Sequence, residues 1–412
     1  MRPNRSIDGL VAELQALAQI TEAEPPVVTR VVFGEADLRA RAYVKGLCVA
    51  AGLTVNEDAV GNTFARWQGS DPELAPIGTG SHIDAIPNAG SYDGVVGVLG
   101  GLEAIRVLQE LGFAPRRSIE LVIFTAEEPT RFGIGCLGSR MMGGALSPEK
   151  AQSLRDKEGR SLDELREQAG FAGPLESVKL PGGRFHKFIE LHIEQGPLLE
   201  KEGIDIGLVT YIAAPASLKI VIEGEGGHAG AKLMPGRKDA LAAAAELILA
   251  LESAAKSTGA IDTVGTVGVC EVFPGAVNSI PSRVRLEVDI RDIDRRRRDG
   301  VIRSFFDGFQ EVALRRGIDI GADVVNADPP AQCDEQTLAV MENAAAEAGK
   351  SAKRMVSRAY HDSLFVARIA PTAMLFIPCR GGVSHRPDEY ASPEWIGSGV
   401  HVLARTLAAL AS

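Results

Sequence analysis

The chain has 412 residues, of which 45% are hydrophobic and 24% are charged. This length exceeds what one ordinary core accommodates, so we expect two domains, and the composition excludes a disordered or fibrous protein. The formal net charge of −10 argues against nucleic-acid binding, because an acidic surface repels phosphates. The sequence has no run of about 18 apolar residues that could span a bilayer, so we expect no membrane partner.

The five cysteines are far apart and form no CxxC pair, which is typical of reduced thiols in a cytosol and excludes a zinc ribbon. The N-terminal stretch MRPNRSIDGLVAELQAL alternates apolar and polar residues at helical spacing. It lacks the apolar centre and small-residue cleavage site of a signal peptide. We therefore expect a cytoplasmic protein.

The first half of the chain has the pattern of an α/β domain. Amphipathic helices, with apolar positions three and four apart, come first. A strand that ends in a glycine-rich loop, a helix and a continuous apolar strand then form a β–α–β unit, which is typical of a parallel sheet. In chain order we expect helices over residues 6–20 and 35–51, a strand over 75–82, a helix over 92–111, and strands over 118–125 and 188–193.

A different pattern follows, and it predicts a small inserted domain. Two strand–helix–strand stretches in succession are typical of a ferredoxin-like α+β sandwich. We expect strands over 218–223, 263–272 and 284–291, helices over 239–251 and 297–315, and then a further strand of the first domain over 372–378. The fold class is therefore α/β with two domains: an α/β domain over 1–209 and 327–412, and an inserted ferredoxin-like domain over 210–326.

Histidines and carboxylates stand at the ends of the predicted strands, which is where open α/β sheets bind ligands. A single histidine is more often a packed or surface residue, and a Glu-Glu pair is usually a solvated helix face. Here the pair follows a buried strand directly. Imidazole and carboxylate groups suit Zn²⁺, Mn²⁺ or Co²⁺, and two ions can share one bridging carboxylate. The segments are SHID at 81–84, YDG at 92–94, TAEE at 125–128, LHIE at 191–194 and VSHRP at 383–387.

Five longer runs carry a resemblance to a known family. They are GSHIDAIPNAGSYDGVVGVLGGLEAI, FTAEEPTRFGIGCLGSR, ELHIEQGPLLE, GEGGHAGAKLMPGRKDA and PCRGGVSHRPDEY. They resemble the dinuclear-metal aminoacylase/carboxypeptidase superfamily, in particular its hydantoinase/carbamoylase-type amidase branch. The resemblance extends from about Asp8 to Leu407. Within the branch, EEPTRFGI, GGHAGAKLMP, DTVGTVGV and SRAYHDSLFVARI are most similar to plant-type ureidoglycolate amidohydrolases.

The resemblance implies a site for two divalent metal ions per subunit, with Mn²⁺ favoured and Zn²⁺, Co²⁺ or Ni²⁺ also compatible. One carboxylate would bridge the two ions. A glutamate that is not a metal ligand would be the general base, and an aspartate would fix the orientation of one ligating histidine ring. Carried over to this sequence, the ligands are His82 and His192 for one ion, Glu128 and His385 for the other and Asp93 as the bridge, with Glu127 as the base and Asp84 behind His82.

The same resemblance implies a second set of residues that bind the substrate. His228 would stabilise the oxyanion, from the same subunit or from a partner. Arg291 would bind a carboxylate, although an ion pair with Asp289 is an alternative. The full set is Gln195, His228, Asn278, Arg291, Tyr360, His361 and Gly382.

The function that this resemblance implies is hydrolysis of a C–N bond in a small ureido or N-carbamoyl acid. The expected reaction converts (S)-ureidoglycolate to glyoxylate, ammonia and carbon dioxide in a homodimer assembled through the inserted domain, which would also act as a lid. Other substrates stay open, namely N-carbamoyl-L-amino acids, other N-acyl amino acids, allantoate and peptides. A metal-binding protein without turnover is a further alternative.

Overall fold

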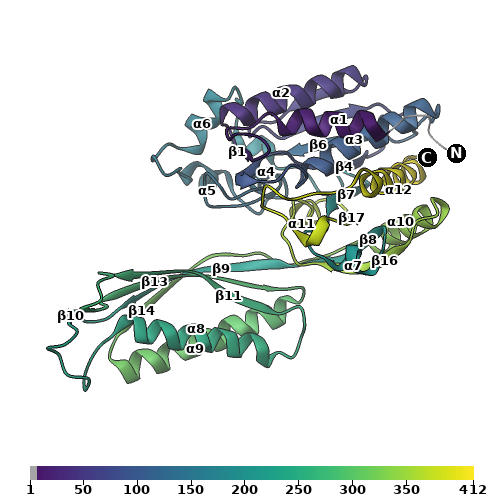
Figure 1. Ribbon diagram of the computed structural model, residues 1–412. Helices are drawn as coiled ribbons and strands as arrows, with labels where there is room; N and C mark the ends of the chain where they lie inside the picture. Colours follow the sequence, from purple (N-terminus) through teal and green to yellow (C-terminus); the bar gives the residue numbers. More distant parts are fainter. Residues whose placement is uncertain (1–6) are drawn as a thin grey trace. The chain divides into compact units, whose positions relative to one another are not determined.

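The computed structural model describes residues 7–412, so Ser6 of the first predicted helix lies outside the described residues (Figure 1). The chain divides into two compact units. The first runs to Thr210 and continues over Gln332–Met355 and His361–Ser412, and the second comprises Tyr211–Ala331 and Val356–Tyr360. None of the helices in the described part of the chain is both long and apolar enough to cross a membrane.

The larger sheet has nine strands within residues 7–412. They are β2 (Thr54–Glu57), β3 (Thr63–Trp67), β4 (Ile77–His82), β6 (Ile119–Phe124), β7 (Lys187–Ile193), β8 (Ile206–Ile212), β15 (Ala331–Gln332), β16 (Ala352–Ser357) and β17 (Thr372–Ile377). Their order is β15-β8-β17-β7-β4-β6-β3-β2, with β16 paired to β8. The central strands β17, β7, β4 and β6 are parallel, β8 is antiparallel to β17, and β3 is antiparallel to both β6 and β2.

The register of the parallel strands brings their carboxyl ends to one edge. His82 at the end of β4 is level with Phe124 at the end of β6. In the other pair, His192 of β7 is level with Phe376 of β17. Side chains that end these strands, or directly follow them, therefore share one edge of the sheet.

Helices cover this sheet, and a small antiparallel pair formed by β1 (Val28–Arg30) and β5 (Ala85–Ala89) lies apart from it. The helices are α1 (Ile7–Ala18), α2 (Glu35–Ala50), α3 (Val95–Glu110), α4 (Leu137–Met142), α5 (Pro148–Ser153), α6 (Leu162–Gln168), α7 (Leu198–Glu202), α10 (Glu335–Glu347), α11 (Ser363–Val366) and α12 (Pro393–Ala411), with 3-10 turns η1 (Leu175–Val178) and η2 (Arg380–Gly382).

Helix α3 is buried at every residue from Val95 to Leu108, and all of these residues except Glu103 and Arg106 are apolar. Glycines allow its close approach to the sheet. A Cβ at Gly97 would lie 2.3 Å from the carbonyl oxygen of Leu191, and one at Gly100 would lie 2.8 Å from the Leu191 side chain. Glu190, the residue directly before Leu191 on β7, accepts a hydrogen bond from the backbone N–H of Ser363 in α11. Because successive strand residues face opposite sides, α3 and α11 cover opposite faces of the sheet.

The second unit confirms the ferredoxin-like fold. Its elements in chain order are β9 (Ala214–Glu223), α8 (Ala240–Ser257), β11 (Val264–Phe273), β13 (Arg283–Asp292), α9 (Arg295–Arg316) and β14 (Asp319–Ala327), with the short pair β10 (Gly227–His228) and β12 (Ser279–Ile280). The sheet order is β11-β13-β9-β14 and every pairing is antiparallel. Helices α8 and α9 lie together on one side of this sheet (Figure 1).

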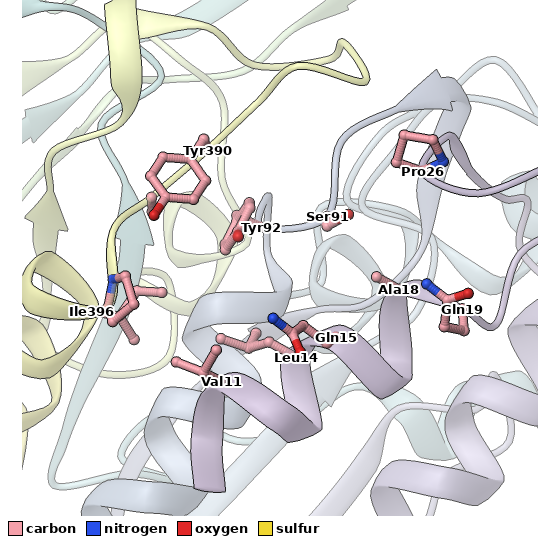
Figure 2. Close-up of a pocket in the computed structure, with 12 residues that line it drawn as sticks. Val11, Leu14, Gln15, Ala18, Gln19, Pro26, Ser91, Tyr92, Tyr390 and Ile396 are labelled. Carbon is pink, nitrogen blue, oxygen red and sulfur yellow. The ribbon is translucent and has the colours of Figure 1, made fainter. Parts of the chain in front are cut away.

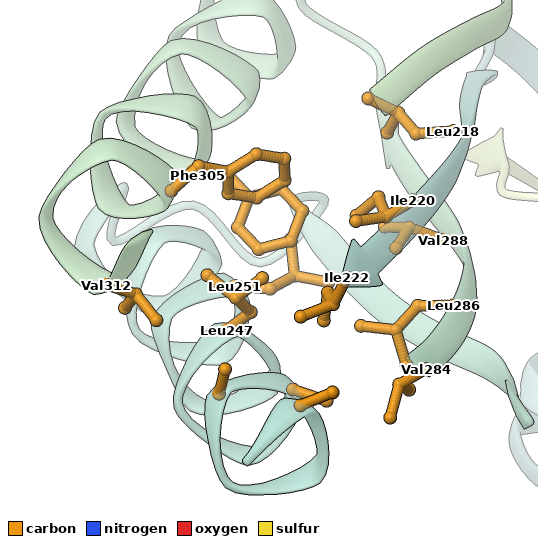
Figure 3. Packing of buried hydrophobic residues seen from close by; sticks show 14 of the residues in the cluster. Leu218, Ile220, Ile222, Leu247, Leu251, Val284, Leu286, Val288, Phe305 and Val312 are labelled. Atoms are coloured by element: carbon orange, nitrogen blue, oxygen red, sulfur yellow. The ribbon is translucent and has the colours of Figure 1, made fainter. Parts of the chain in front are cut away.

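The core of the second unit lies between this sheet and its two helices (Figure 3). Alternate residues of β9 and β13 face inward, and both helices begin at an aspartate whose carboxylate accepts backbone N–H groups of the first turn. The inward residues of the strands are Leu218, Ile220, Ile222, Val284, Leu286 and Val288, and they pack on Leu247, Leu251, Phe305 and Val312.

The surroundings of two helical glycines, Gly97 in α3 and Gly46 in α2, predict opposite effects of an alanine substitution on stability. Gly97→Ala should destabilise the first unit by about 1–3 kcal/mol, because the added methyl overlaps Leu191 and pushes α3 from the sheet. Gly46→Ala in α2 is the matched control, since its Cβ meets no atom within 4 Å, and it should stabilise by about 0.5–1 kcal/mol. Thermal unfolding of both variants measures the shifts. Equal midpoints would contradict the packing described.

Candidate metal centre and active site

Five ligand-type side chains come together at the carboxyl edge of the larger sheet. β4 ends at His82, β7 carries His192 one residue before its end, and Glu128 lies in the loop after β6. Asp93 precedes α3, and His385 follows β17 and η2. The side chains of His82 and His192 are almost fully buried, whereas that of His385 is 47% exposed.

The carboxylate of Asp93 lies between two groups of these side chains. Its Oδ1 is 3.1 Å from Nε2 of His192 and 3.8 Å from Nε2 of His82. Its Oδ2 is 3.0 Å from Nε2 of His385, which is in turn 3.3 Å from Oε1 of Glu128. Within each group the ligand atoms all lie within 4.8 Å of one another. The structure thus assembles two three-residue sets that share Asp93.

Both buried rings direct Nε2 toward Asp93, and Nε2 of His192 also accepts the backbone N–H of Gly94 at 3.2 Å. Nδ1 of His82 is 3.0 Å from the carbonyl oxygen of Asp84, and Nδ1 of His192 is 2.9 Å from that of Ile193. A proton on Nδ1 donates to each carbonyl, so Nε2 keeps its lone pair. Imidazole nitrogen and carboxylate oxygen together are the donors that Zn²⁺, Mn²⁺ and Co²⁺ accept. The donor set therefore fits two divalent cations.

Buried negative charge dominates the electrostatics of the site. Burial raises the pKa of Glu127 well above its ordinary value, although the neighbouring His82 opposes this, and burial also raises the pKa of Glu128. Burial acts in the same direction on Asp93, but hydrogen bonds from His192 and His385 hold its pKa well below the usual range. Hydrogen bonds to Asp93 and Glu128 raise the pKa of His385 to about 11. The protein compensates these carboxylates with protons, and a bound cation supplies the same compensation.

The adjacent glutamates face different partners. Ala126 has a left-handed φ of 53°, which turns the chain just before the pair. Oε2 of Glu127 lies 3.8 Å from Nε2 of His82, whereas Glu128 contacts His385. The two carboxylates can therefore act on different ligands.

Asp84 holds this turn in place. Its Oδ1 accepts the backbone N–H of Glu127 at 3.2 Å, and its Oδ2 accepts that of Glu128 at 3.1 Å. The carboxylate is 3.6 Å from Nδ1 of His82, so the hydrogen bond to that ring comes from the Asp84 main chain. The side chain of Asp84 thus positions the glutamates more directly than it positions the ring.

The buried Glu389 and the half-buried Ser384 support the site, and the sequence alone did not predict them. Oε1 of Glu389 accepts the backbone N–H groups of Tyr92 at 2.7 Å and Asp93 at 3.0 Å. The hydroxyl of Ser384 lies 2.9 Å from both Oε2 of Glu389 and Oδ2 of Asp93. Both residues stand in the run PCRGGVSHRPDEY after the last strand, but nothing in its spacing indicates a contact with residues almost 300 positions earlier.

Three of the predicted substrate-binding residues lie in the first unit. Nε2 of Gln195 donates to Oδ2 of Asp93 at 2.9 Å, while its buried Oε1 has no hydrogen-bond partner among residues 7–412. The ring of His361 lies 4.6 Å from that of His192, centroid to centroid. Gly382 has a φ of 67°, and a Cβ there would lie 2.5 Å from the backbone nitrogen of Pro197.

The other four predicted substrate residues belong to the second unit. Nδ1 of the exposed His228 accepts backbone N–H groups from its own loop, and the carbonyl of Asn278 accepts the N–H of Ala229 beside it. Arg291 forms the ion pair with Asp289 that the alternative interpretation predicts. The hydroxyl of Tyr360 donates to Asp328 at 3.2 Å. His228 and Asn278 are thus brought close together within this unit, at the β10–β12 pair.

A cavity of about 270 Å³ lies behind the loop that carries Asp93 (Figure 2). Val11, Leu14 and Gln15 of α1 point into it from one side, and Tyr92 and Tyr390 from the other (Figure 2). None of the predicted ligands or substrate residues lines it. It is therefore separate from the predicted site.

Comparisons with known proteins show which family the chain resembles. A model of peptidase family M20/M25/M40 matches residues 78–409. Ureidoglycolate hydrolase of Arabidopsis thaliana is 54% identical over 411 residues, covering 98% of this chain and 86% of the relative. The ureidoglycolate hydrolase of Oryza sativa subsp. japonica is 52% identical over 410 residues, covering 98% and 84%. The solved structure of AtUAH in complex with (S)-hydroxyglycine has a TM-score of 0.91 and 52% identity, and covers 99% of this chain and 98% of that one.

The matched residues 78–409 include all five ligand-type side chains and Glu127. The regions matched by the family model, the two relatives and the solved structure thus include the strand ends, the loop after β6 and the inserted unit. The chain belongs to peptidase family M20/M25/M40.

Proposed function

We propose that this protein is a metal-dependent amidohydrolase that cleaves (S)-ureidoglycolate to glyoxylate, ammonia and carbon dioxide. The observation that carries the chemistry is the carboxylate of Asp93 shared between two ligand sets. The substrate rests on the relatives, two of which, named ureidoglycolate hydrolase, are 52% and 54% identical over 98% of the chain.

The proposed ligands are His82 and His192 for one cation, Glu128 and His385 for the other, and Asp93 for both. When bound, the two cations supply an acidified water and polarise the carbonyl that it attacks. Mn²⁺ is the proposed native ion, with Zn²⁺, Co²⁺ and Ni²⁺ as alternatives.

Glu127 is the proposed general base and acid. A urea-type carbonyl is a poor electrophile because both of its nitrogens donate electrons into it, so the attacking water must lose its proton and the leaving nitrogen must gain one. The buried Glu127 carboxylate, with Oε2 3.8 Å from Nε2 of His82, is placed to hold this proton between the two steps. Gln195, held on Asp93 by its amide nitrogen, keeps its oxygen available for an N–H group of the ureido substrate.

The remaining proposed roles belong to residues of both units. His228 stabilises the oxyanion, and Asn278 and Arg291 bind the substrate carboxylate, for which Arg291 must exchange its ion pair with Asp289. Tyr360, His361 and Gly382 line the substrate. Residues 210–326 are the proposed lid and dimerisation domain, 1–209 and 327–412 form the catalytic domain, and His228 acts on the active site of the other subunit in a cytoplasmic homodimer.

The substrate is tested by ammonia release. Protein reconstituted with Mn²⁺ is offered (S)-ureidoglycolate, allantoate and N-carbamoyl-L-amino acids side by side, before and after treatment with a chelator. We expect release from ureidoglycolate that chelation abolishes and Mn²⁺ restores, with two ions per chain by elemental analysis. Release chiefly from another substrate would keep the metal chemistry and overturn the substrate. Activity that survives complete metal removal would overturn both.

Removal of the general base should abolish catalysis but leave metal binding unchanged. We expect Glu127→Gln to lower kcat by about 10²–10⁴-fold, because the amide cannot take a proton from water. Its metal content should stay unchanged, since Glu127 is not a proposed ligand. Glu73→Gln, at an exposed position of the same unit, is the control and should behave as the wild type. A Glu127→Gln protein within tenfold of wild type would remove Glu127 from the mechanism.

The trans role of His228 is tested by complementation. Glu127→Gln and His228→Ala should each be nearly inactive alone. Unfolded together and refolded, they form mixed dimers in which one site combines an intact Glu127 with the partner's intact His228. Random assembly should then restore about a quarter of wild-type activity. A mixture that stays as inactive as its components would show that both residues must come from one chain.

A further inference from the structure

Cys136 is a buried residue in an unfavourable backbone conformation. It directly precedes α4, its side chain is fully buried, and its φ of 54° lies in the left-handed region. A glycine adopts this conformation without strain, whereas a residue with a Cβ is disfavoured there. A side chain kept at such a position calls for an explanation by what it touches.

The thiol of Cys136 touches the proposed general base. Its Sγ lies 3.4 Å from Oε1 of Glu127, within hydrogen-bond distance for sulfur. The thiol thus donates a hydrogen bond to one oxygen of Glu127, whose other oxygen lies near His82. Burial raises the pKa of Cys136 well above its ordinary value, so the sulfur keeps its proton and remains a donor.

Backbone hydrogen bonds also hold the Cys136 segment against the segment that carries Glu127. The N–H of Cys136 donates to the carbonyl of Glu127 at 2.7 Å, and the next two residues donate to Ala126 at 2.9 Å and Thr125 at 2.8 Å. A Cβ at Gly138 would lie 2.8 Å from the Thr125 nitrogen, so the two segments lie as close as backbones can. The start of α4 and the loop of the base therefore form one rigid pair, with the thiol placed toward the carboxylate.

We propose that Cys136 is a positioning residue, whose thiol holds Oε1 of Glu127 so that Oε2 faces the metal ligands. Oε2 is the oxygen 3.8 Å from Nε2 of His82, on the side where the water would be bound. A carboxylate that is held at one oxygen presents the other in a fixed direction, and proton transfer depends on that direction. The inference rests on the proposed role of Glu127 as the base.

Turnover by three variants tests this role. Cys136→Ala should lower kcat by about five- to tenfold, as expected for the loss of one hydrogen bond of ordinary strength, with KM within twofold and metal content unchanged. Cys136→Ser restores a donor and should recover most of the loss. Cys48→Ala removes another buried thiol, in α2, and should match the wild type. A kcat for Cys136→Ala within twofold of wild type, or a serine variant no faster than alanine, would overturn the proposal.

A spectroscopic measurement gives the same answer without any turnover. The S–H stretching band lies in an infrared region free of other protein absorption, and it moves to lower frequency when the thiol donates to a carboxylate. We expect a low-frequency band that is absent in Cys136→Ala, present in Cys48→Ala, and moved to higher frequency in Glu127→Gln. Absence of such a band in the wild type would overturn the contact.

The two readouts separate this inference from the proposed function. If (S)-ureidoglycolate is not cleaved but the Cys136 band is present and responds to Glu127→Gln, the substrate proposal fails and the contact stands. If the substrate is cleaved while the band and kcat are insensitive to Cys136→Ala, the positioning role fails alone.

Discussion

The structure of the first unit depends on the surroundings of one carboxylate. Asp93 is buried and lies near three histidine nitrogens, while Gln195 and Ser384 approach the same Oδ2 at 2.9 Å. A buried charge is tolerated only where opposite charge or hydrogen bonds compensate it. The strand ends, the start of α3 and the loop after β17 must therefore meet at this point. Divalent cations shared by these ligands meet the same requirement more fully than protons do.

Backbone strain gathers where these loops meet. Ala126, Gln195 and His385 all have left-handed φ values, of 53°, 56° and 59°. Each is a residue with a Cβ; Ala126 and Gln195 lie two residues after the ends of β6 and β7, and His385 lies in the loop after η2. Strain of this kind persists only where surrounding contacts over-determine the conformation. The parallel sheet supplies these contacts. Its loops can therefore keep residues in left-handed backbone conformations that an unsupported loop would not maintain.

Local patterns predicted much of this fold and the composition of its site. The apolar run before Glu127 and the strands that end near His82 and His192 were placed within two residues, because a buried strand and its polar end are both local signals. The ferredoxin-like insertion followed from its strand–helix order. The edge strand β14 was missed, since most of its side chains are exposed and the alternation is weak. Helix α8 runs to Ser257, six residues beyond its predicted end.

The residues that hold the proposed ligands and base in place could not be predicted from local sequence patterns. Glu389 and Tyr92 are far apart in the sequence, and nothing near either residue encodes their contact. Cys136 follows the glutamate pair closely, but its side chain faces Glu127 only because the chain turns at Ala126 and again at Cys136 itself. Arg291 shows the converse, because a nearby aspartate was visible in the sequence and does pair with it.

The exposure of the ligands differs between the two halves of the centre. The side chains of His82 and His192 are 3% and 1% exposed, whereas that of His385 is 47% exposed. Under the proposed ligand assignment, an ion held by the buried pair would leave only when the surrounding loops open, whereas one held through His385 would meet solvent. The outer position would then exchange with the medium faster than the inner one. The free-metal pool of the cell, more than the ion acquired during folding, would decide which element occupies it.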